Sequence, residues 1–274
     1  MKEYYKNRVI LITGAASGIG KRFAEMVSGY QPKAIILWDR NPDTLREIES
    51  NLPDNITVIS HGVDVSGHES IQQHAELVFE SDLLPDIILN CAGVVTGKMF
   101  HEHTADEIVS TIQINTTGSM WVVHAFLDKM VERKSGHIVN LASASGYIGN
   151  PRMSVYAASK WAVLGWSQSL RLEMERLQTG ITVTEVIPSY IKTGMFDGVK
   201  APMLVPLLET DQIVTLMLKG IARRKKKIQA PFMVKFVPLM KALFPDRVFD
   251  WLAGSMLGVY RSMDSFEGRN KEKT

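Results

Sequence analysis

The chain has 274 residues, with 45% hydrophobic and 22% charged residues and a formal net charge of +2. This length buries a sizeable core, and the near-neutral charge together with the lack of aromatic side chains interleaved with basic patches argues against a nucleic-acid partner. Cys91 is the only cysteine, so an internal disulfide framework is excluded and a reducing compartment, the cytoplasm, is expected. We expect no metal, and the first apolar run, Val9–Ile12, is too short for a signal peptide or a membrane span.

A glycine-rich loop follows the first predicted strand. Val9–Ile12 is continuously apolar, as in a strand buried on both faces, and the next eight residues read T-G-A-A-S-G-I-G before an amphipathic helix begins near Lys21. This order presents backbone N–H groups and a helix N-terminus to a pyrophosphate. The spacing is G-x-x-x-G-x-G rather than G-x-G-x-x-G, and a plain tight turn is the alternative. The predicted contacts in the loop are Gly14, Ser17, Gly18, Ile19 and Gly20.

An acidic residue closes the second predicted strand, Ala34–Trp38. Asp39 lies about 20 residues beyond the glycine loop, where a carboxylate binds the ribose 2′-hydroxyl of NAD and repels the 2′-phosphate of NADP. Arg40 is adjacent and works in the opposite direction. NAD is therefore the favoured cofactor, with NADP as the alternative.

Two further segments are expected to contact the nucleotide. After a helix over Asp43–Ser50 and a strand over Ile56–Ile59, Asp64 and Val65 are placed to bracket an adenine ring, although Asp64 could instead cap a helix. After a helix around Ser70–Phe79 and a strand over Ile87–Leu89, the chain reads Asn90-Cys91-Ala92-Gly93. Small residues at the end of a strand leave room for a cofactor to cross the sheet. Cys91 is expected to pack rather than react.

A long helix is predicted over Ala105–Val131, and it carries Asn115. Gly118 is expected to loosen this helix and to free a carbonyl for water. The strand that follows, His137–Leu141, leads into Ser143. Strands that alternate with helices of this length predict an α/β fold with a doubly wound parallel sheet, whose ligand binds at the carboxyl ends of the strands.

The candidate chemistry lies in Ser143, Tyr156 and Lys160. Tyr156 and Lys160 stand four residues apart and share one face of a helix. A nearby ammonium favours the ionised form of a phenol, so Lys160 is expected to lower the pKa of Tyr156 and prepare it to exchange a proton with an alcohol oxygen. Ser143 could hold that oxygen. The same Y-x-x-x-K pattern also occurs as a surface aromatic beside a solvated lysine.

These motifs together resemble the classical short-chain dehydrogenases/reductases over residues 7 to 231. The resemblance implies a single Rossmann-type domain with a seven-stranded parallel sheet and a catalytic tetrad of Asn115, Ser143, Tyr156 and Lys160. In that family the tyrosine is the acid/base, the serine orients the substrate oxygen, and the lysine lowers the tyrosine pKa and holds the nicotinamide ribose. The asparagine positions a water in a proton relay.

After a predicted strand over Val183–Pro188, the segment that begins at Pro188 resembles the family's P-G-x-V-x-T motif. The resemblance implies that Ile191 and Thr193 touch the nicotinamide carboxamide and that Pro188 belongs to the cofactor site. Two departures stand out. Ser189 replaces a glycine, which restricts positive φ, and Cys91 replaces the second asparagine of N-N-A-G.

By family position, the substrate pocket is expected to be lined by Ile148, Met153, Tyr190 and Phe196, with Arg152 either nearby or facing solvent. A largely apolar wall suits a lipophilic secondary alcohol or ketone, such as a steroid, a retinoid or a long-chain alcohol.

The C-terminal part, residues 232–274, is expected to form an extension beyond the catalytic domain, residues 1–231. From Gln212 to Phe244 the chain has eight Lys/Arg and no acidic residue, and it includes the basic cluster of residues 223–227, which the apolar stretch Phe232–Phe244 follows. A basic cluster beside an amphipathic stretch is typical of an interfacial membrane anchor, so residues 220–262 could dock on a membrane surface. A lid or a subunit contact is the alternative. This tail, with the strand end Leu37–Asp39, is loosely similar to the membrane-associated retinol and hydroxysteroid dehydrogenase branch of the family.

The sequence therefore favours an NAD(H)-linked oxidoreductase in which Tyr156 handles the proton. NADPH-linked carbonyl reduction and a non-catalytic protein that senses a nucleotide or docks on membranes are the alternatives. Family analogy suggests a homodimer or homotetramer built on the helices that carry Asn115 and Tyr156.

Overall fold

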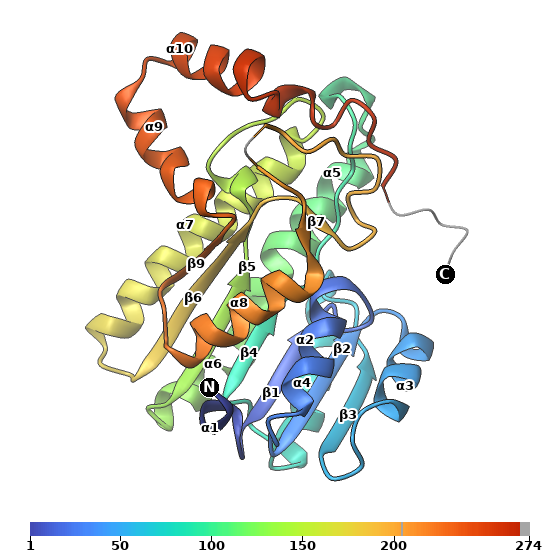
Figure 1. Cartoon of the computed structure of the whole chain (residues 1–274). Helices are drawn as coiled ribbons and strands as arrows, with labels where there is room; N and C mark the ends of the chain where they lie inside the picture. The colour runs from blue at the N-terminus through green and yellow to red at the C-terminus, as the bar shows by residue number, and fades with distance from the viewer. Residues whose placement is uncertain (204, 269–274) are drawn as a thin grey trace.

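A seven-stranded parallel sheet forms the centre of the protein in the computed structural model, which describes residues 1–203 and 205–268 (Figure 1). The strand order is β3-β2-β1-β4-β5-β6-β9 and every neighbouring pair is parallel. The predicted doubly wound, seven-stranded fold is thereby confirmed. The strands are β1 (Val9–Thr13), β2 (Ala34–Asp39), β3 (Thr57–Gly62), β4 (Ile87–Asn90), β5 (Gly136–Leu141), β6 (Ile181–Pro188) and β9 (Lys227–Ala230).

Helices cover both faces of this sheet because its inner strands are buried on both sides. One face packs against α2, α3 and α8, and the other against α4, α6 and α7. Two short strands, β7 (Ile191–Lys192) and β8 (Leu208–Glu209), pair outside the main sheet. The helices from α1 to α8 are α1 (Lys2–Tyr5), α2 (Gly18–Ser28), α3 (Pro42–Ser50), α4 (His68–Glu80), α5 (Ala105–Ile112), α6 (Gly118–Glu132), α7 (Ser154–Arg176) and α8 (Thr210–Ala222).

The helix predicted as one segment over Ala105–Val131 is divided in three. A π-helical turn, Gln113–Thr117, separates α5 from α6 and carries Asn115. A Cβ on Gly118 would lie 2.5 Å from the carbonyl oxygen of Val65, so the glycine lets the helix approach the segment after β3. The expected local loosening is thus present, and it turns Asn115 inward, where it is 1% exposed.

A buried histidine ties the N-terminus to the middle of the sheet. His137 on β5 is fully buried, and its Nε2 lies 2.7 Å from Thr184 Oγ1. Because the Thr184 hydroxyl donates to the Lys225 carbonyl, Nε2 is the donor to Thr184, and Nδ1 accepts from the Tyr4 hydroxyl at 2.7 Å. Only the neutral imidazole can make both hydrogen bonds, because Nδ1 must accept a hydrogen bond from Tyr4 while Nε2 donates one to Thr184. Burial, with Arg224 and Arg8 nearby, lowers the His137 pKa to about 3.

This neutral histidine predicts a loss of stability in mild acid. The folded state resists protonation while the unfolded chain takes up a proton near pH 6.5, so the stabilisation is complete above that pH and declines as pH falls toward 3. Between pH 7 and pH 5 we expect the free energy of unfolding to fall by about 2 kcal/mol because of this group.

Urea unfolding of the wild type and of His137→Gln measures this effect. The free energy of unfolding should depend less steeply on pH in the variant. The exposed His101→Gln is the control and should keep the wild-type slope; equal slopes for His137→Gln and wild type would contradict the assignment.

The C-terminal extension begins after β9 and arches over the carboxyl ends of the strands (Figure 1). It contains a 3₁₀ turn (Phe232–Phe236), α9 (Val237–Leu243), α10 (Asp246–Asp250), a π-helical turn (Trp251–Met256) and a 3₁₀ turn (Val259–Arg261). The last part of the extension predicted over 232–274, residues 269–274, lies outside the described residues. Within the described ranges, no helix combines the length and apolar character needed to cross a bilayer.

The basic cluster of residues 223–227 does not lie beside the extension, contrary to the expectation from sequence. The cluster precedes and enters β9 at its amino end, whereas the extension leaves the carboxyl end. Three of its side chains are engaged locally: Arg224 donates to the Gly180 carbonyl, Lys226 pairs with Glu175, and Lys227 pairs with Glu185. Proximity in sequence suggested one basic and apolar surface, but the intervening strand separates the two.

Candidate active site

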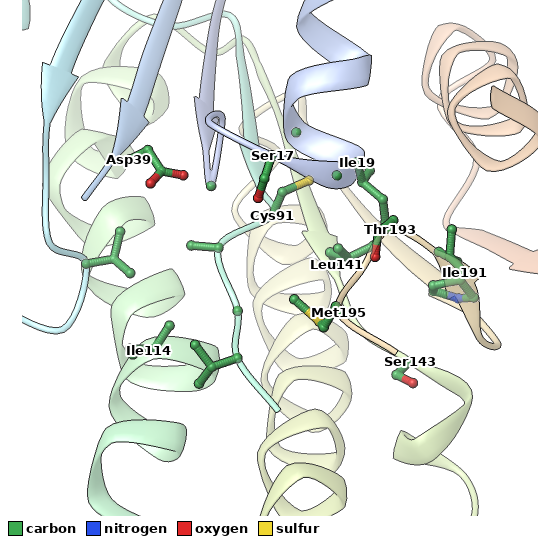
Figure 2. Close-up of a pocket in the computed structure, with 18 of the residues that line it drawn as sticks. Ser17, Ile19, Asp39, Cys91, Ile114, Leu141, Ser143, Ile191, Thr193 and Met195 are labelled. Atoms are coloured by element: carbon green, nitrogen blue, oxygen red, sulfur yellow. The ribbon is translucent and has the colours of Figure 1, made fainter. Parts of the chain in front are cut away.

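A cleft opens at the carboxyl ends of the strands, where the strand order reverses between β1 and β4 (Figure 2). In Figure 2, Asp39 lies toward one end of this cleft and Ser143 toward the other. Most of the predicted cofactor contacts line it: Gly14, Ser17, Gly18, Ile19, Gly20, Asp39, Asp64, Val65, Ala92, Gly93, Tyr156, Lys160, Pro188, Ile191 and Thr193. The topology therefore collects segments that are far apart in sequence into one site.

The glycine loop is packed backbone against backbone. Gly14 has φ +66, and a Cβ there would lie 2.7 Å from the amide nitrogen of Ala92. A Cβ on Gly20 would lie 2.3 Å from the carbonyl oxygen of Gly14. The loop leads into α2 at Gly18, so the first N–H groups of α2 face the cleft and are available to an anion such as a pyrophosphate.

The carboxylate of Asp39 is held in place at the end of β2. One of its oxygens accepts from the amide of Ala16 at 3.0 Å and the other from the amide of Asn41 at 3.1 Å. Both Asp39 and the neighbouring Arg40 line the cleft. A fixed carboxylate with free lone pairs is suited to accept hydrogen bonds from a ribose diol. The Arg40 guanidinium could instead pair with a 2′-phosphate.

Asp64 does not cap the next helix. Its Oδ1 accepts from the amide of Ser66 at 2.9 Å and from the Ser66 hydroxyl at 2.7 Å, whereas α4 begins at His68 with Gly67 at its N-cap. Asp64 and Val65 instead line the cleft, next to Val63. The alternative of a capping role is therefore excluded, and the position is the one expected for an adenine contact.

Asn90 is placed differently from the prediction. Its side chain is buried, and its Nδ2 donates to Asn140 Oδ1 at 2.9 Å, while Asn140 donates in turn to Ser167 Oγ at 2.9 Å. Asn90 is not among the residues that line the cleft. Its amide ties β4 to β5 and, through Asn140, to α7, and the cofactor contact expected of Asn90 stays a prediction.

Ser143, Tyr156 and Lys160 meet at one end of the cleft. Tyr156 and Lys160 lie on α7, and Ser143 follows β5, with its Oγ accepting from the amide of Ser145 at 3.1 Å. Lys160 Nζ donates to the Leu141 carbonyl at 2.8 Å and stands 5.7 Å from the centroid of the Tyr156 ring. The predicted sharing of one helix face is thus realised, and all three side chains line the cleft.

The pKa of Tyr156 is raised, which is the opposite of the predicted direction. Burial raises it, and the Ser143 hydroxyl beside the phenol offsets only part of that effect. Burial also lowers the Lys160 pKa to about 8. Both side chains are buried, and burial penalises the charged form of each, so desolvation rather than the Lys160 ammonium sets the direction of the Tyr156 shift. A phenol whose pKa lies above its ordinary value keeps its proton at neutral pH.

Asn115 supports the site from behind the cleft. Its Oδ1 accepts from the amide of Val94 at 2.7 Å, and its Nδ2 donates to the Val94 carbonyl at 2.9 Å and to Ser159 Oγ at 3.0 Å. A Cβ on Gly93 would lie 3.3 Å from this oxygen and 3.8 Å from Lys160 Nζ. Asn115 therefore fixes the loop that runs past Lys160, and the water relay implied by family resemblance stays a prediction.

Six further residues line the cleft and were not predicted from the sequence. These are Val63, Val94, Ile114, Leu141, Ala142 and Met195. Most of them are adjacent in sequence to a predicted site residue. Their position next to a predicted residue was therefore the one feature of the sequence that could have identified them. Cys91 also lines the cleft, and burial raises its thiol pKa to about 12, which agrees with a packing role.

A second cavity of about 420 Å³ adjoins the cleft and is almost entirely apolar. We call it the apolar chamber. It shares Ser143, Ser189 and Phe196 with the cleft, so it opens onto the catalytic end. Its far wall comes from the C-terminal extension, which contributes ten residues: Met233, Val234, Phe236, Val237, Met240, Phe249, Leu252, Ala253, Leu257 and Val259.

Three of the four predicted wall residues line the apolar chamber, namely Ile148, Tyr190 and Phe196. Met153 does not; it is 1% exposed and packs behind Tyr190. Arg152 also points elsewhere, because its Nε donates to the Gly97 carbonyl at 3.2 Å. Ser189 does not need glycine's freedom here, since its φ is not positive.

The fold and this arrangement of side chains match one family. The family model described as short chain dehydrogenase matches residues 8–203, and the chain belongs to that family. Among curated relatives, the epidermal retinol dehydrogenase 2 of Mus musculus is 31% identical over 269 residues, covering 96% of this chain and 86% of the relative. The 17-beta-hydroxysteroid dehydrogenase 13 of Homo sapiens is 32% identical over 241 residues, covering 87% and 80%.

Solved structures agree with the fold and with a nicotinamide dinucleotide site. A short-chain dehydrogenase/reductase from Burkholderia phymatum, in complex with NAD, superposes with a TM-score of 0.79 at 25% identity, covering 87% of this chain and 94% of that one. A short-chain dehydrogenase from Sphingobium yanoikuyae, in complex with NADPH, gives 0.74 at 28% identity, covering 92% and 94%. The family therefore includes members solved with either nucleotide.

Proposed function

We propose that this protein is an NAD(H)-linked oxidoreductase that interconverts a lipophilic secondary alcohol and its ketone, with Tyr156 as the acid/base. The observation that carries the proposal is the junction at Ser143: one side is a cleft lined by a glycine loop and the Asp39 carboxylate, and the other is the apolar chamber. The names of the relatives, retinol and hydroxysteroid dehydrogenases, support a lipophilic alcohol.

A nicotinamide dinucleotide fits the cleft because the glycine loop leaves the N-terminus of α2 open to its pyrophosphate. The loop lies so close to Ala92 that a side chain at Gly14 would clash with it. Such a cofactor would supply or accept the hydride. The chain's own part is to hold the substrate oxygen between the Ser143 hydroxyl and the Tyr156 phenol, so that the phenol proton moves to or from that oxygen. Lys160, fixed by the Leu141 carbonyl, places an ammonium beside the reacting groups.

NAD preference rests on Asp39 and leads to a selectivity prediction. Asp39→Asn keeps the shape of the side chain but removes its charge and one acceptor. We expect the ratio of NADPH to NADH affinity to rise roughly 10-fold or more, because the ribose loses a charge-assisted hydrogen bond and a 2′-phosphate loses a repulsive neighbour. Titration followed by nicotinamide fluorescence measures both affinities.

Asp43→Asn, on an exposed part of α3, is the matched control and should leave the ratio unchanged. A wild type that binds NADPH more tightly than NADH would favour the second candidate, an NADPH-linked carbonyl reductase directed by Arg40. Failure to bind either nucleotide would contradict the enzyme proposal. Nucleotide binding without turnover of any alcohol or ketone would indicate a non-catalytic nucleotide sensor.

We further propose that the protein is cytoplasmic, works at a membrane surface, and forms a homodimer or homotetramer through α5 and α7. Exposed apolar side chains on these two helices, Val109 and Leu172, support a subunit contact. Analytical ultracentrifugation of the wild type measures the oligomer directly.

A further inference from the structure

The C-terminal extension has two apolar faces. Its inner face lines the apolar chamber, as described above. The extension also exposes eight large apolar side chains to solvent, more than any other stretch of similar length in the described residues. We call them the outer apolar patch, and they are Phe232, Met233, Phe236, Leu239, Leu243, Val248, Trp251 and Met256. Exposed apolar patches of this kind mark interaction sites.

The mouth of the apolar chamber lies within this patch. Met233 and Phe236 line the chamber and yet remain 41% and 39% exposed, so each is in contact with both the chamber and the surface. Met203, which also lines the chamber, is 54% exposed. We place the opening of the chamber at these side chains, because each contributes both to the chamber wall and to the solvent-exposed surface. The entrance is therefore ringed by apolar groups rather than by the polar groups that would suit a substrate arriving from water.

The charges of the first part of the patch, residues 232–245, suit an anionic surface. Residues 232–245 contain Lys235 and Lys241 and no acidic residue. Lys235 Nζ lies 4.8 Å from the Phe232 ring centroid, and Lys241 Nζ lies 4.6 Å from that of Trp161, which is itself 46% exposed on α7. Lysines lying against exposed aromatic rings at the edge of an apolar surface are the arrangement that interfacial helices use at lipid headgroups. The acidic residues of the extension come later in the sequence: Asp246 and Asp250 lie in α10, Asp264 and Glu267 follow it, and Glu272 lies outside the described residues.

We infer that the outer apolar patch docks shallowly on an anionic lipid bilayer and that the apolar chamber then opens into the bilayer, which delivers the lipophilic substrate directly to Ser143 and Tyr156. This inference rests on the proposed function for the nature of the substrate. It also differs from the surface expected from sequence, because the basic cluster of residues 223–227 lies at the other end of β9 and takes no part.

The test uses the full chain and vesicles of phosphatidylcholine with phosphatidylserine. Leu239, Leu243 and Trp251 are exposed and do not line the apolar chamber, so the triple variant L239S/L243S/W251S removes docking groups without altering the site. We expect flotation with vesicles to fall at least 10-fold in this variant. The matched control is L77S/L177S, which removes two apolar side chains that are 43% and 65% exposed near the ends of α4 and α7; it should float as the wild type does.

A charge pair of variants separates the two basic regions. K235E/K241E should lose flotation, and R223E/K225E should retain it. The reverse result would overturn the inference in favour of the cluster before β9. Flotation of L239S/L243S/W251S equal to that of the wild type would also overturn it. So would a wild type that does not float but sediments as a dimer that the same triple variant dissociates, because a second copy of the chain would then cover the patch.

Turnover distinguishes failure of docking from failure of the proposed function. With NAD and a short, water-soluble secondary alcohol, L239S/L243S/W251S should match the wild type, while with a long-chain secondary alcohol embedded in vesicles its rate should fall roughly 10-fold. Equal rates of variant and wild type on the embedded alcohol would overturn delivery from the bilayer and leave the enzyme proposal standing. Flotation as expected with no turnover of either alcohol would support docking and reject the proposed function.

Discussion

Tyr156→Phe is expected to lower kcat by roughly 10³-fold while leaving cofactor affinity unchanged. The variant keeps the ring that packs at 6.0 Å from the Phe196 ring centroid and removes only the oxygen that exchanges the proton. Since burial raises the Tyr156 pKa, the phenol carries its proton at neutral pH, the state needed to protonate a ketone oxygen. Reduction of a lipophilic ketone at neutral pH is therefore the assay that detects the loss.

Tyr147→Phe is the matched control, because this half-buried tyrosine lies between Ser143 and Tyr156 in sequence but lines neither the cleft nor the apolar chamber. It should keep wild-type turnover. A Tyr156→Phe variant with more than about a tenth of wild-type kcat would assign proton transfer to another group. Fluorescence titration of both variants with NADH shows whether binding has been spared.

Gly14→Ala is expected to abolish detectable NADH binding and to destabilise the fold by about 2 kcal/mol or more. The residue has φ +66, which a side chain resists, and the added Cβ would lie 2.7 Å from the Ala92 nitrogen and 2.8 Å from its Cα. The clash is with backbone, so it cannot be relieved by a rotamer change. The loop must move away from β4, and the N–H groups aimed at the pyrophosphate move with it.

Gly165→Ala provides the contrast. This glycine lies within α7, and nothing stands within 4 Å of a Cβ built on it. Alanine should therefore stabilise the helix by roughly 0.5–1 kcal/mol and leave binding unchanged. Urea unfolding and nucleotide titration of both variants separate the effects; a Gly14→Ala protein that binds NADH as tightly as the wild type would show that the loop does not hold the pyrophosphate.

Much of the site could be predicted because its parts depend on short spacings. An apolar run followed by a glycine loop, an acidic residue ending the next strand, and a serine after a later strand each mark the carboxyl end of a strand. In a parallel sheet those ends must lie along one edge. Tyr156 and Lys160 required only the helical repeat to share a face. For these residues the short-range sequence pattern was enough to predict a place in the site, because the parallel sheet then brings the strand ends together along one edge.

The remaining features depend on packing between segments far apart in the chain. Asn90 and Asn115 both belong to sequence motifs that predicted a role in the site. Asn90 instead bonds to Asn140 on β5, and Asn115 bonds to the backbone of Val94, so neither side chain lines the cleft. The direction of the Tyr156 pKa depends on burial, which spacing does not report. Likewise, β9 places the basic cluster and the extension at opposite ends of one strand. The sequence by itself determined the fold class and the meeting of Ser143, Tyr156 and Lys160 at one edge of the sheet. Only the tertiary structure decided the environment of these side chains and the walls of the apolar chamber, because desolvation and long-range contacts arise from the folded arrangement as a whole.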